Sequence, residues 1–258
     1  MQATKNEKAQ GDAPGPDNEQ AEKRKRSLRI KLIDAVIILC VLTGLALLLS
    51  RPVGVLITDR QHEKAIDEYI AAVDRLTDAE LTEIRERAID YNVRYAIARP
   101  YIWAEPYGEF KQDYPTELSV PGTDVIGYIE ISSIDVRLPI YHYSSDESMS
   151  RGCGHSECTS LPIGGTDGHY VLMSHRDMMT AVTFEHLDKL KEGDTFSVTV
   201  LKETATFEID GIRVVDPNRF DDYIDDKVEE GKQLCTLVTC TPSGSTSHRL
   251  FVCGVRIK

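Results

Sequence analysis

Three side chains in the sequence have the chemistry of an acyl-transfer site. Cys240 ends a run that reads TLVTC, Arg249 follows nine positions later, and His175 ends a second apolar run that reads VLMSH. A thiol becomes nucleophilic when a neighbouring imidazole or cation raises its thiolate fraction, and the imidazole can also protonate a leaving amine. Arginine keeps its proton, so Arg249 only donates hydrogen bonds and charge, which suits an oxyanion or a substrate carbonyl. We predict Cys240 as the nucleophile, His175 as the general acid and base, and Arg249 as the oxyanion and substrate stabiliser. The alternative is that Cys240 is an inert thiol buried in a strand.

The elements that would carry these residues are β-strands. Beyond residue 124 the chain alternates short runs rich in β-branched residues with Gly, Pro or Asp turns, a pattern typical of strands. It predicts a single β-barrel or sandwich over residues 124–258, with a short helical insert at 184–190. His175 and Cys240 then end two strands and Arg249 begins another, so we expect their side chains to converge at one edge. The eight predicted strands are residues 125–131, 136–141, 170–174, 196–201, 204–209, 212–215, 234–239 and 249–257.

The N-terminal part has the composition of a membrane anchor. Residues 1–31 carry few large apolar side chains and are predicted to be a disordered, basic, cytoplasmic tail. Residues 32–50 form an apolar run interrupted by Asp34, long enough to cross a bilayer as one helix. The Lys and Arg cluster at 23–31 places the N-terminus in the cytoplasm and everything after the run outside. We expect an uncleaved, single-pass signal anchor in the cell membrane. A cleaved signal peptide fits less well, because the run starts about 30 residues into the chain and no clear small-x-small site follows.

Two helices, or one helix with a break, are predicted between the membrane and the barrel, in an extension over residues 51–99. Apolar residues recur at helical spacing over 66–76 and again over 81–95. Between the two sets, Thr77 and Glu80 have the spacing of a capping box, which starts a new helix. The following residues, 100–123, are rich in Pro, Gly, Tyr and acidic residues and too long for a simple connector. We predict a lid or a linker there.

Charge and cysteine content limit the function classes. The chain carries a formal net charge of −12, made up of +2 up to residue 50 and −14 beyond it, and the acidic part argues against nucleic acid as a partner. Cationic partners are compatible with this charge, although an acidic surface also serves solubility. We expect no cofactor and no metal, because the sequence has neither a CxxC motif nor metal-ligand spacing. Cys153 and Cys158 have the spacing of a small disulfide, while Cys235 and Cys253 fit buried strand positions. The remaining histidines are interpreted as solvated or structural.

Several stretches of the sequence resemble the sortases, membrane-anchored cysteine transpeptidases of Gram-positive bacteria. The resemblance covers residues 125–257, about half the chain. Its markers are TLVTC ending at Cys240, SHR at residues 174–176 and HRLFV from His248. The stretches GYIEI, RLPIYH, TSLPIGG, FEHLDKLKEGD and TLVTCTP are most similar to class C, the pilin-polymerising sortases. This resemblance implies an eight-stranded sortase-like β-barrel with short helices.

The resemblance also implies a reaction. Cys240 would attack the Thr carbonyl of a sorting signal similar to LPxTG and form a thioacyl intermediate. His175 would protonate the departing Gly amine, Arg249 would stabilise the oxyanion, and a pilin lysine amine would then take the acyl group. Thr239 would help to shape the substrate pocket, or serve as an ordinary strand residue.

The sequence also departs from the class C pattern. Class C members commonly carry an Asp-Pro-aromatic lid motif, to which Glu105-Pro106-Tyr107 is the nearest match. Ser243 stands where the class often has an aromatic residue. A second membrane helix, common in class C at the C-terminus, has no counterpart in this sequence.

Three other functions compete with pilus assembly. The first is a housekeeping sortase that attaches surface proteins to a peptidoglycan precursor amine. The second is a non-catalytic scaffold that binds sorting signals or pili, which the presence of all three site residues disfavours. The third is a redox protein, disfavoured by the missing CxxC motif.

Overall fold

A computed structural model describes residues 16–98, 112–164, 168–178, 180–181, 183–219 and 231–258. The chain divides into two compact units, residues 1–51 and 52–258. Glu105 and Tyr107, the predicted lid residues, lie outside the described residues.

The first unit consists of the N-terminal part of helix α1, which runs over Pro16–Asp74 and continues into the second unit. Its most apolar window has a mean hydropathy of 2.8 and is not buried by protein, so the helix is long and apolar enough for a single membrane span. The helix begins at Pro16, inside the range predicted to be disordered. The helix begins this early because residues 19–26 are Ala, Glu, Gln, Lys and Arg. Such residues lengthen a helix that is already nucleated.

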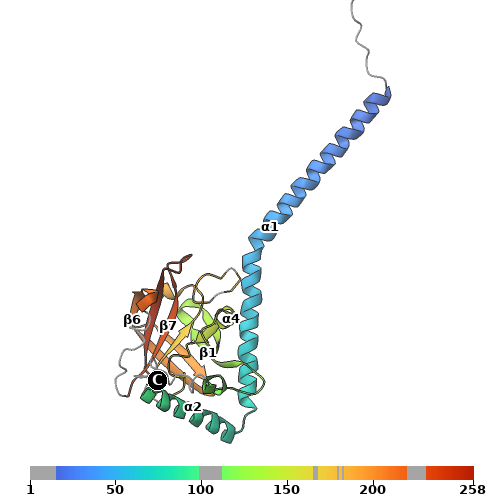
Figure 1. Ribbon diagram of the computed structural model, residues 1–258. Helices are drawn as coiled ribbons and strands as arrows, with labels where there is room; N and C mark the ends of the chain where they lie inside the picture. Colours follow the sequence, from blue (N-terminus) through green and yellow to red (C-terminus); the bar gives the residue numbers. More distant parts are fainter. Residues whose placement is uncertain (1–15, 99–111, 165–167, 179, 182, 220–230) are drawn as a thin grey trace, which may run out of the picture. The chain divides into compact units, whose positions relative to one another are not determined.

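Helix α2 (Asp78–Ala98) begins at the predicted capping box. The backbone N–H of Thr77 donates to the Glu80 carboxylate at 2.7 Å, and the N–H of Glu80 donates to the Thr77 hydroxyl at 3.3 Å. One face of α2 is buried against the barrel through Ala88, Tyr91 and Tyr95, which belong to the same core cluster as the strands. Figure 1 shows α2 beside the barrel.

The second unit is built on a closed barrel of eight strands in the order β1-β2-β3-β4-β7-β8-β6-β5. Adjacent strands are antiparallel except for β2–β3 and β4–β7, which are parallel. Short helices interrupt the strands at α4 (Asp146–Arg151), η2 (Tyr114–Thr116), η3 (Ser132–Ile134), η4 (Leu187–Lys189) and η5 (Pro217–Arg219). The strands are β1 (Val125–Ile131), β2 (Val136–His142), β3 (Cys153–His155), β4 (Gly168–Met173), β5 (Thr195–Val200), β6 (Glu203–Val215), β7 (Gln233–Thr241) and β8 (His248–Arg256).

The predicted barrel is confirmed, with two corrections to its strands. The runs at 204–209 and 212–215 form one strand, β6, because a register shift between Ile209 and Gly211 absorbs the apparent turn against β8. Strand β3 was not predicted, since three residues are too few to show an alternating pattern. The helical insert expected at 184–190 is reduced to the single turn η4.

Candidate active site

The parallel pair β4–β7 brings His175 beside Cys240. Met173 and Val238 are register partners, and the pairing continues past the strand end, where the N–H of Ser174 donates to the Val238 carbonyl at 3.2 Å. The hydroxyl of Thr239 in turn donates to the Ser174 carbonyl at 2.9 Å. His175 and Cys240 each lie two positions beyond the last register pair. The register therefore places the imidazole-bearing and thiol-bearing residues side by side.

The antiparallel pair β7–β8 brings in Arg249, which is the register partner of Cys240. Directly opposed residues of an antiparallel pair share one face of the sheet, with Cβ atoms about 4.5–5.5 Å apart. The guanidinium of Arg249 donates from Nη1 to the carbonyls of Thr246 at 2.9 Å and His248 at 3.2 Å. The loop that joins the two strands thus holds the guanidinium. The three residues predicted from the sequence meet at one end of the barrel.

Accessibility separates Cys240 from two other barrel cysteines, Cys153 and Cys235. Cys240 is partly buried, and the His175 side chain is 33% exposed. Cys153 and Cys235 are fully buried, and burial raises the pKa of both thiols well above the ordinary value. Because the thiolate is the reactive form, these two cysteines are poor nucleophiles. Cys153 and Cys158 are both thiols, so the disulfide considered from their spacing is not formed.

Arg176 and Asp177, which follow His175, bind the loop after Cys240, a role that was not predicted from the sequence. Arg176 is 7% exposed and donates from Nη1 to the Thr241 hydroxyl at 3.0 Å and to the Cys240 carbonyl at 3.5 Å. Its Nη2 donates to Asp188 at 2.6 Å. The guanidinium therefore joins the backbone of Cys240 to the segment that follows His175. The sequence offered one signal for this role, since an arginine directly follows His175, the predicted general base.

Asp177 holds the other part of the same loop. Its carboxylate accepts hydrogen bonds from the Ser243 hydroxyl and, at 2.8 Å, from the N–H of Gly244. Ser243 was noted only as a departure from an aromatic residue, and the structure gives its hydroxyl this partner. Arg176 and Asp177 thus connect the His175 segment to both ends of the turn after Cys240.

Thr239 is 2% exposed and uses its hydroxyl to join β7 to Ser174. This contact stabilises the pairing that places His175 beside Cys240. A role of Thr239 in substrate binding stays a prediction. His155 and His169 are buried and hydrogen-bonded, as expected of structural histidines.

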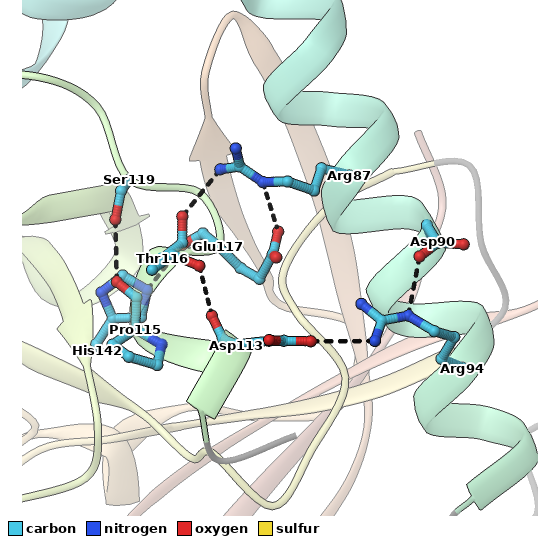
Figure 2. A network of polar contacts seen from close by, with 9 residues as sticks. All are labelled: Arg87, Asp90, Arg94, Asp113, Pro115, Thr116, Glu117, Ser119 and His142. Atoms are coloured by element: carbon cyan, nitrogen blue, oxygen red, sulfur yellow. Dashed lines mark hydrogen bonds and ion pairs between the residues drawn. The ribbon is translucent and has the colours of Figure 1, made fainter. Parts of the chain in front are cut away.

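The C-terminal part of the predicted lid, residues 113–117, is fastened to α2 and to the barrel by a polar network (Figure 2). Arg94 binds Asp113 at 3.1 Å, and Arg87 binds the Glu117 carboxylate at 3.3 Å. The Glu117 carbonyl accepts from His142 Nε2 at 2.8 Å. Residues 113–117, inside the range predicted as a lid or linker, are thereby fixed to α2 and to His142 of β2.

The sortase domain model matches residues 129–257, half of the chain. The chain belongs to the sortase family. Sortase C1 of Streptococcus agalactiae is 37% identical, with a TM-score of 0.66 over 76% of this sortase and 98% of that chain. A sortase C of Clostridium perfringens, solved with the C-terminal cell wall sorting motif, is 32% identical, with a TM-score of 0.59 over 76% and 98%. Sortase A of Bacillus anthracis is 26% identical over 136 residues, 53% of this sortase and 61% of the relative. The curated relatives are matched over 50 to 63% of their length.

Proposed function

We propose that this sortase is a cysteine transpeptidase that cleaves an LPxTG-like sorting signal between Thr and Gly and transfers the acyl part to a pilin lysine amine. The observation that carries the proposal is the strand register, which sets Cys240 opposite Arg249 and beside His175 at one barrel end. The similarity to sortases of class C supports the pilin acceptor.

Each residue has one task in the proposed reaction. The Cys240 thiolate attacks the Thr carbonyl carbon, and Arg249 donates hydrogen bonds to the oxyanion that forms. His175 protonates the Gly nitrogen as the C–N bond breaks, which leaves a thioacyl enzyme. The lysine amine then attacks the thioacyl carbon, His175 takes its proton, and the C–S bond breaks to return the Cys240 thiolate. Thr239 is proposed to contribute to the substrate pocket.

The proposal extends to the domain arrangement. Residues 32–50 are proposed to anchor the chain in the cell membrane, with residues 1–31 in the cytoplasm and the catalytic barrel, residues 124–258, outside. The helical extension, residues 51–99, would lie between them. Residues 100–123, which include Glu105 and Tyr107, are proposed to act as a lid over Cys240. The apolar part of α1 supports the anchor.

The alternative acceptor is an amine of a peptidoglycan precursor, as in a housekeeping sortase. Similarity to relatives named sortase A favours this second candidate. Both candidates share the thioacyl step and differ only in the amine that resolves it.

The test is to incubate the full chain in detergent with an LPxTG-type peptide and to look for an acyl adduct by intact mass. We expect an adduct that a pilin lysine resolves, and no adduct on the Cys240→Ala variant. Cys253→Ala is the matched control, since it removes another partly buried thiol of the same sheet and should keep the adduct. An adduct on the Cys240→Ala variant would refute the assignment. Resolution only by a cross-bridge amine would favour wall anchoring.

A further inference from the structure

Residues 175–184, the His175 loop, close on their own first residue, and the structure describes all of them except 179 and 182. The N–H of Phe184 donates to the His175 carbonyl at 3.0 Å, and the Thr183 hydroxyl donates to the same oxygen. Thr183 and Phe184 are both completely buried, which fixes this end of the loop in the protein interior. The position of His175 therefore depends on the path of the residues that follow it.

The same loop also holds the backbone around Cys240. Arg176 donates to the Cys240 carbonyl, and Asp177 accepts from the N–H of Gly244 in the turn after the nucleophile. Both residues directly follow His175, so a shift of the His175 loop changes the position of the imidazole relative to the thiol. Catalytic groups have to be held within about 0.5 Å of the productive geometry. A misplacement of about 1 Å can slow a reaction about a hundredfold.

The His175 loop contacts helix α1 at a glycine. A Cβ atom added to Gly54 would lie 2.9 Å from Cγ2, 3.0 Å from Cβ and 3.1 Å from Cα of Thr180. Rotation of the threonine side chain relieves only the first of these contacts, because Cβ and Cα do not move with χ1. Ordinary van der Waals contacts begin at 3.4 Å, so an alanine at position 54 would force helix and loop apart by the difference, about 0.3–0.5 Å.

Helix α1 is the fixed partner in this contact. Its buried face follows helical spacing through Gly54, Thr58, His62, Ile66, Tyr69 and Val73. The Tyr69 hydroxyl donates to the Ile126 carbonyl at 3.1 Å and accepts from the N–H of Leu201 at 2.7 Å, which joins α1 to the barrel. Thr180, in contrast, is exposed. When a larger side chain crowds the contact, the His175 loop therefore moves and the helix stays in place.

We propose that Gly54 is a positioning residue for the transfer reaction. Its missing side chain lets Thr180 lie against α1, and this contact sets the path of the His175 loop. The loop in turn sets the imidazole of His175 against the thiol of Cys240. The inference rests on the proposed function, because it takes these two residues as the reacting pair. It also gives α1 two roles, since the helix that carries the proposed membrane anchor also supports the His175 loop.

Single-turnover acylation of Cys240 by an LPxTG-type peptide, on the full chain in non-ionic detergent, measures the effect. Gly54→Ala should slow acylation about threefold or more, and Gly54→Val about tenfold or more, since valine displaces the loop further. Thr180→Gly should restore most of the rate in the Gly54→Ala chain, because it removes the two side-chain atoms nearest the added carbon. The same substitutions at Gly44 are the matched controls. They lie in the same helix with nothing within 4 Å of the added carbon, and they should leave the rate unchanged.

A second measurement does not need the reaction. The imidazole signals of the full chain labelled with ¹⁵N-histidine report the surroundings of His175, whose signal is assigned by its loss in His175→Gln. Gly54→Ala should shift the His175 signal and leave the signal of buried His155 unchanged. Because alanine favours a helix more than glycine does, this variant keeps α1 folded.

Four results would each overturn the inference. They are acylation at the wild-type rate in both Gly54 variants, an unchanged His175 signal, an equal effect of the Gly44 variants, and no restoration by Thr180→Gly. Absence of any adduct on the wild-type chain would instead contradict the proposed function, and the His175 signal would still test the contact between the loop and α1.

Discussion

Tyr114→Phe removes one buried oxygen atom from η2, in the C-terminal part of the predicted lid. Tyr114 is 1% exposed, and its hydroxyl lies 2.7 Å from Nδ1 of His155 and 3.3 Å from the N–H of Tyr143. Nε2 of His155 faces the Ser160 carbonyl at 2.8 Å. Since a carbonyl only accepts, Nε2 carries the proton and Nδ1 accepts from the tyrosine hydroxyl. The hydroxyl in turn accepts from Tyr143.

The magnitude follows from the two groups that lose their partner. Phenylalanine keeps the ring contacts with His142 and Tyr143, whose centroids lie 5.1 and 5.0 Å away, so little packing is lost. His155 Nδ1 and the Tyr143 N–H become unpaired in the protein interior. Each unsatisfied buried group costs about 1–3 kcal/mol, so the loss of two partners should lower the free energy of unfolding by about 2–6 kcal/mol. That is a large fraction of a typical domain's total.

Urea unfolding of the full chain in non-ionic detergent, followed by far-UV circular dichroism, measures the change. Tyr128→Phe is the control. It removes the same atom from β1, where the hydroxyl has no hydrogen bond to a described residue, and should cost less than about 0.5 kcal/mol. The reasoning is refuted if Tyr114→Phe is as stable as the wild type, or if both variants lose the same stability.

Three further predictions concern pH, the nucleophile and the lid. Burial lowers the pKa of His155 to about 3. Below about pH 6.5 the His155 imidazole therefore binds a proton in the unfolded chain but stays neutral in the folded chain. This difference lowers the free energy of unfolding by about 1.4 kcal/mol per pH unit as the pH drops from about 6.5 towards 3. Urea titrations at several pH values should show a shallower slope for His155→Gln, and an unchanged slope contradicts the assignment. Arg176→Met should slow acylation of Cys240 about tenfold or more by releasing its backbone. It should change the free energy of unfolding by no more than about 1 kcal/mol, because exposed Asp188 returns to water; single-turnover acylation at the wild-type rate would exclude this role. Replacing Glu105 and Tyr107 with Ala should speed alkylation of Cys240 by iodoacetamide, and an unchanged rate argues for a linker.

Most strands, the start of α2 and three site residues could be predicted from the sequence, because the patterns that mark them are local. The β-branched runs predicted most strands of the barrel, because alternation and turn residues act over a few positions. The capping box at Thr77 marked the start of α2, since both of its hydrogen bonds are local. Cys240, His175 and Arg249 were identified by residue type and by their positions at predicted strand ends. The register then brought these three together.

Only the tertiary structure decided the contacts between distant segments. Strand β3 exists because its neighbours β2 and β4 bury and pair it, not because of any pattern in three residues. Tyr114 and His155, 41 positions apart, and Asp177 and Ser243, 66 positions apart, become partners when the barrel closes. The pocket lined by Asp59, His62, Ile134 and Asp135 likewise joins α1 to the turn between β1 and β2. Such pairings depend on strand order and register, which are set by the packing of the whole core and leave no signal within a window of sequence.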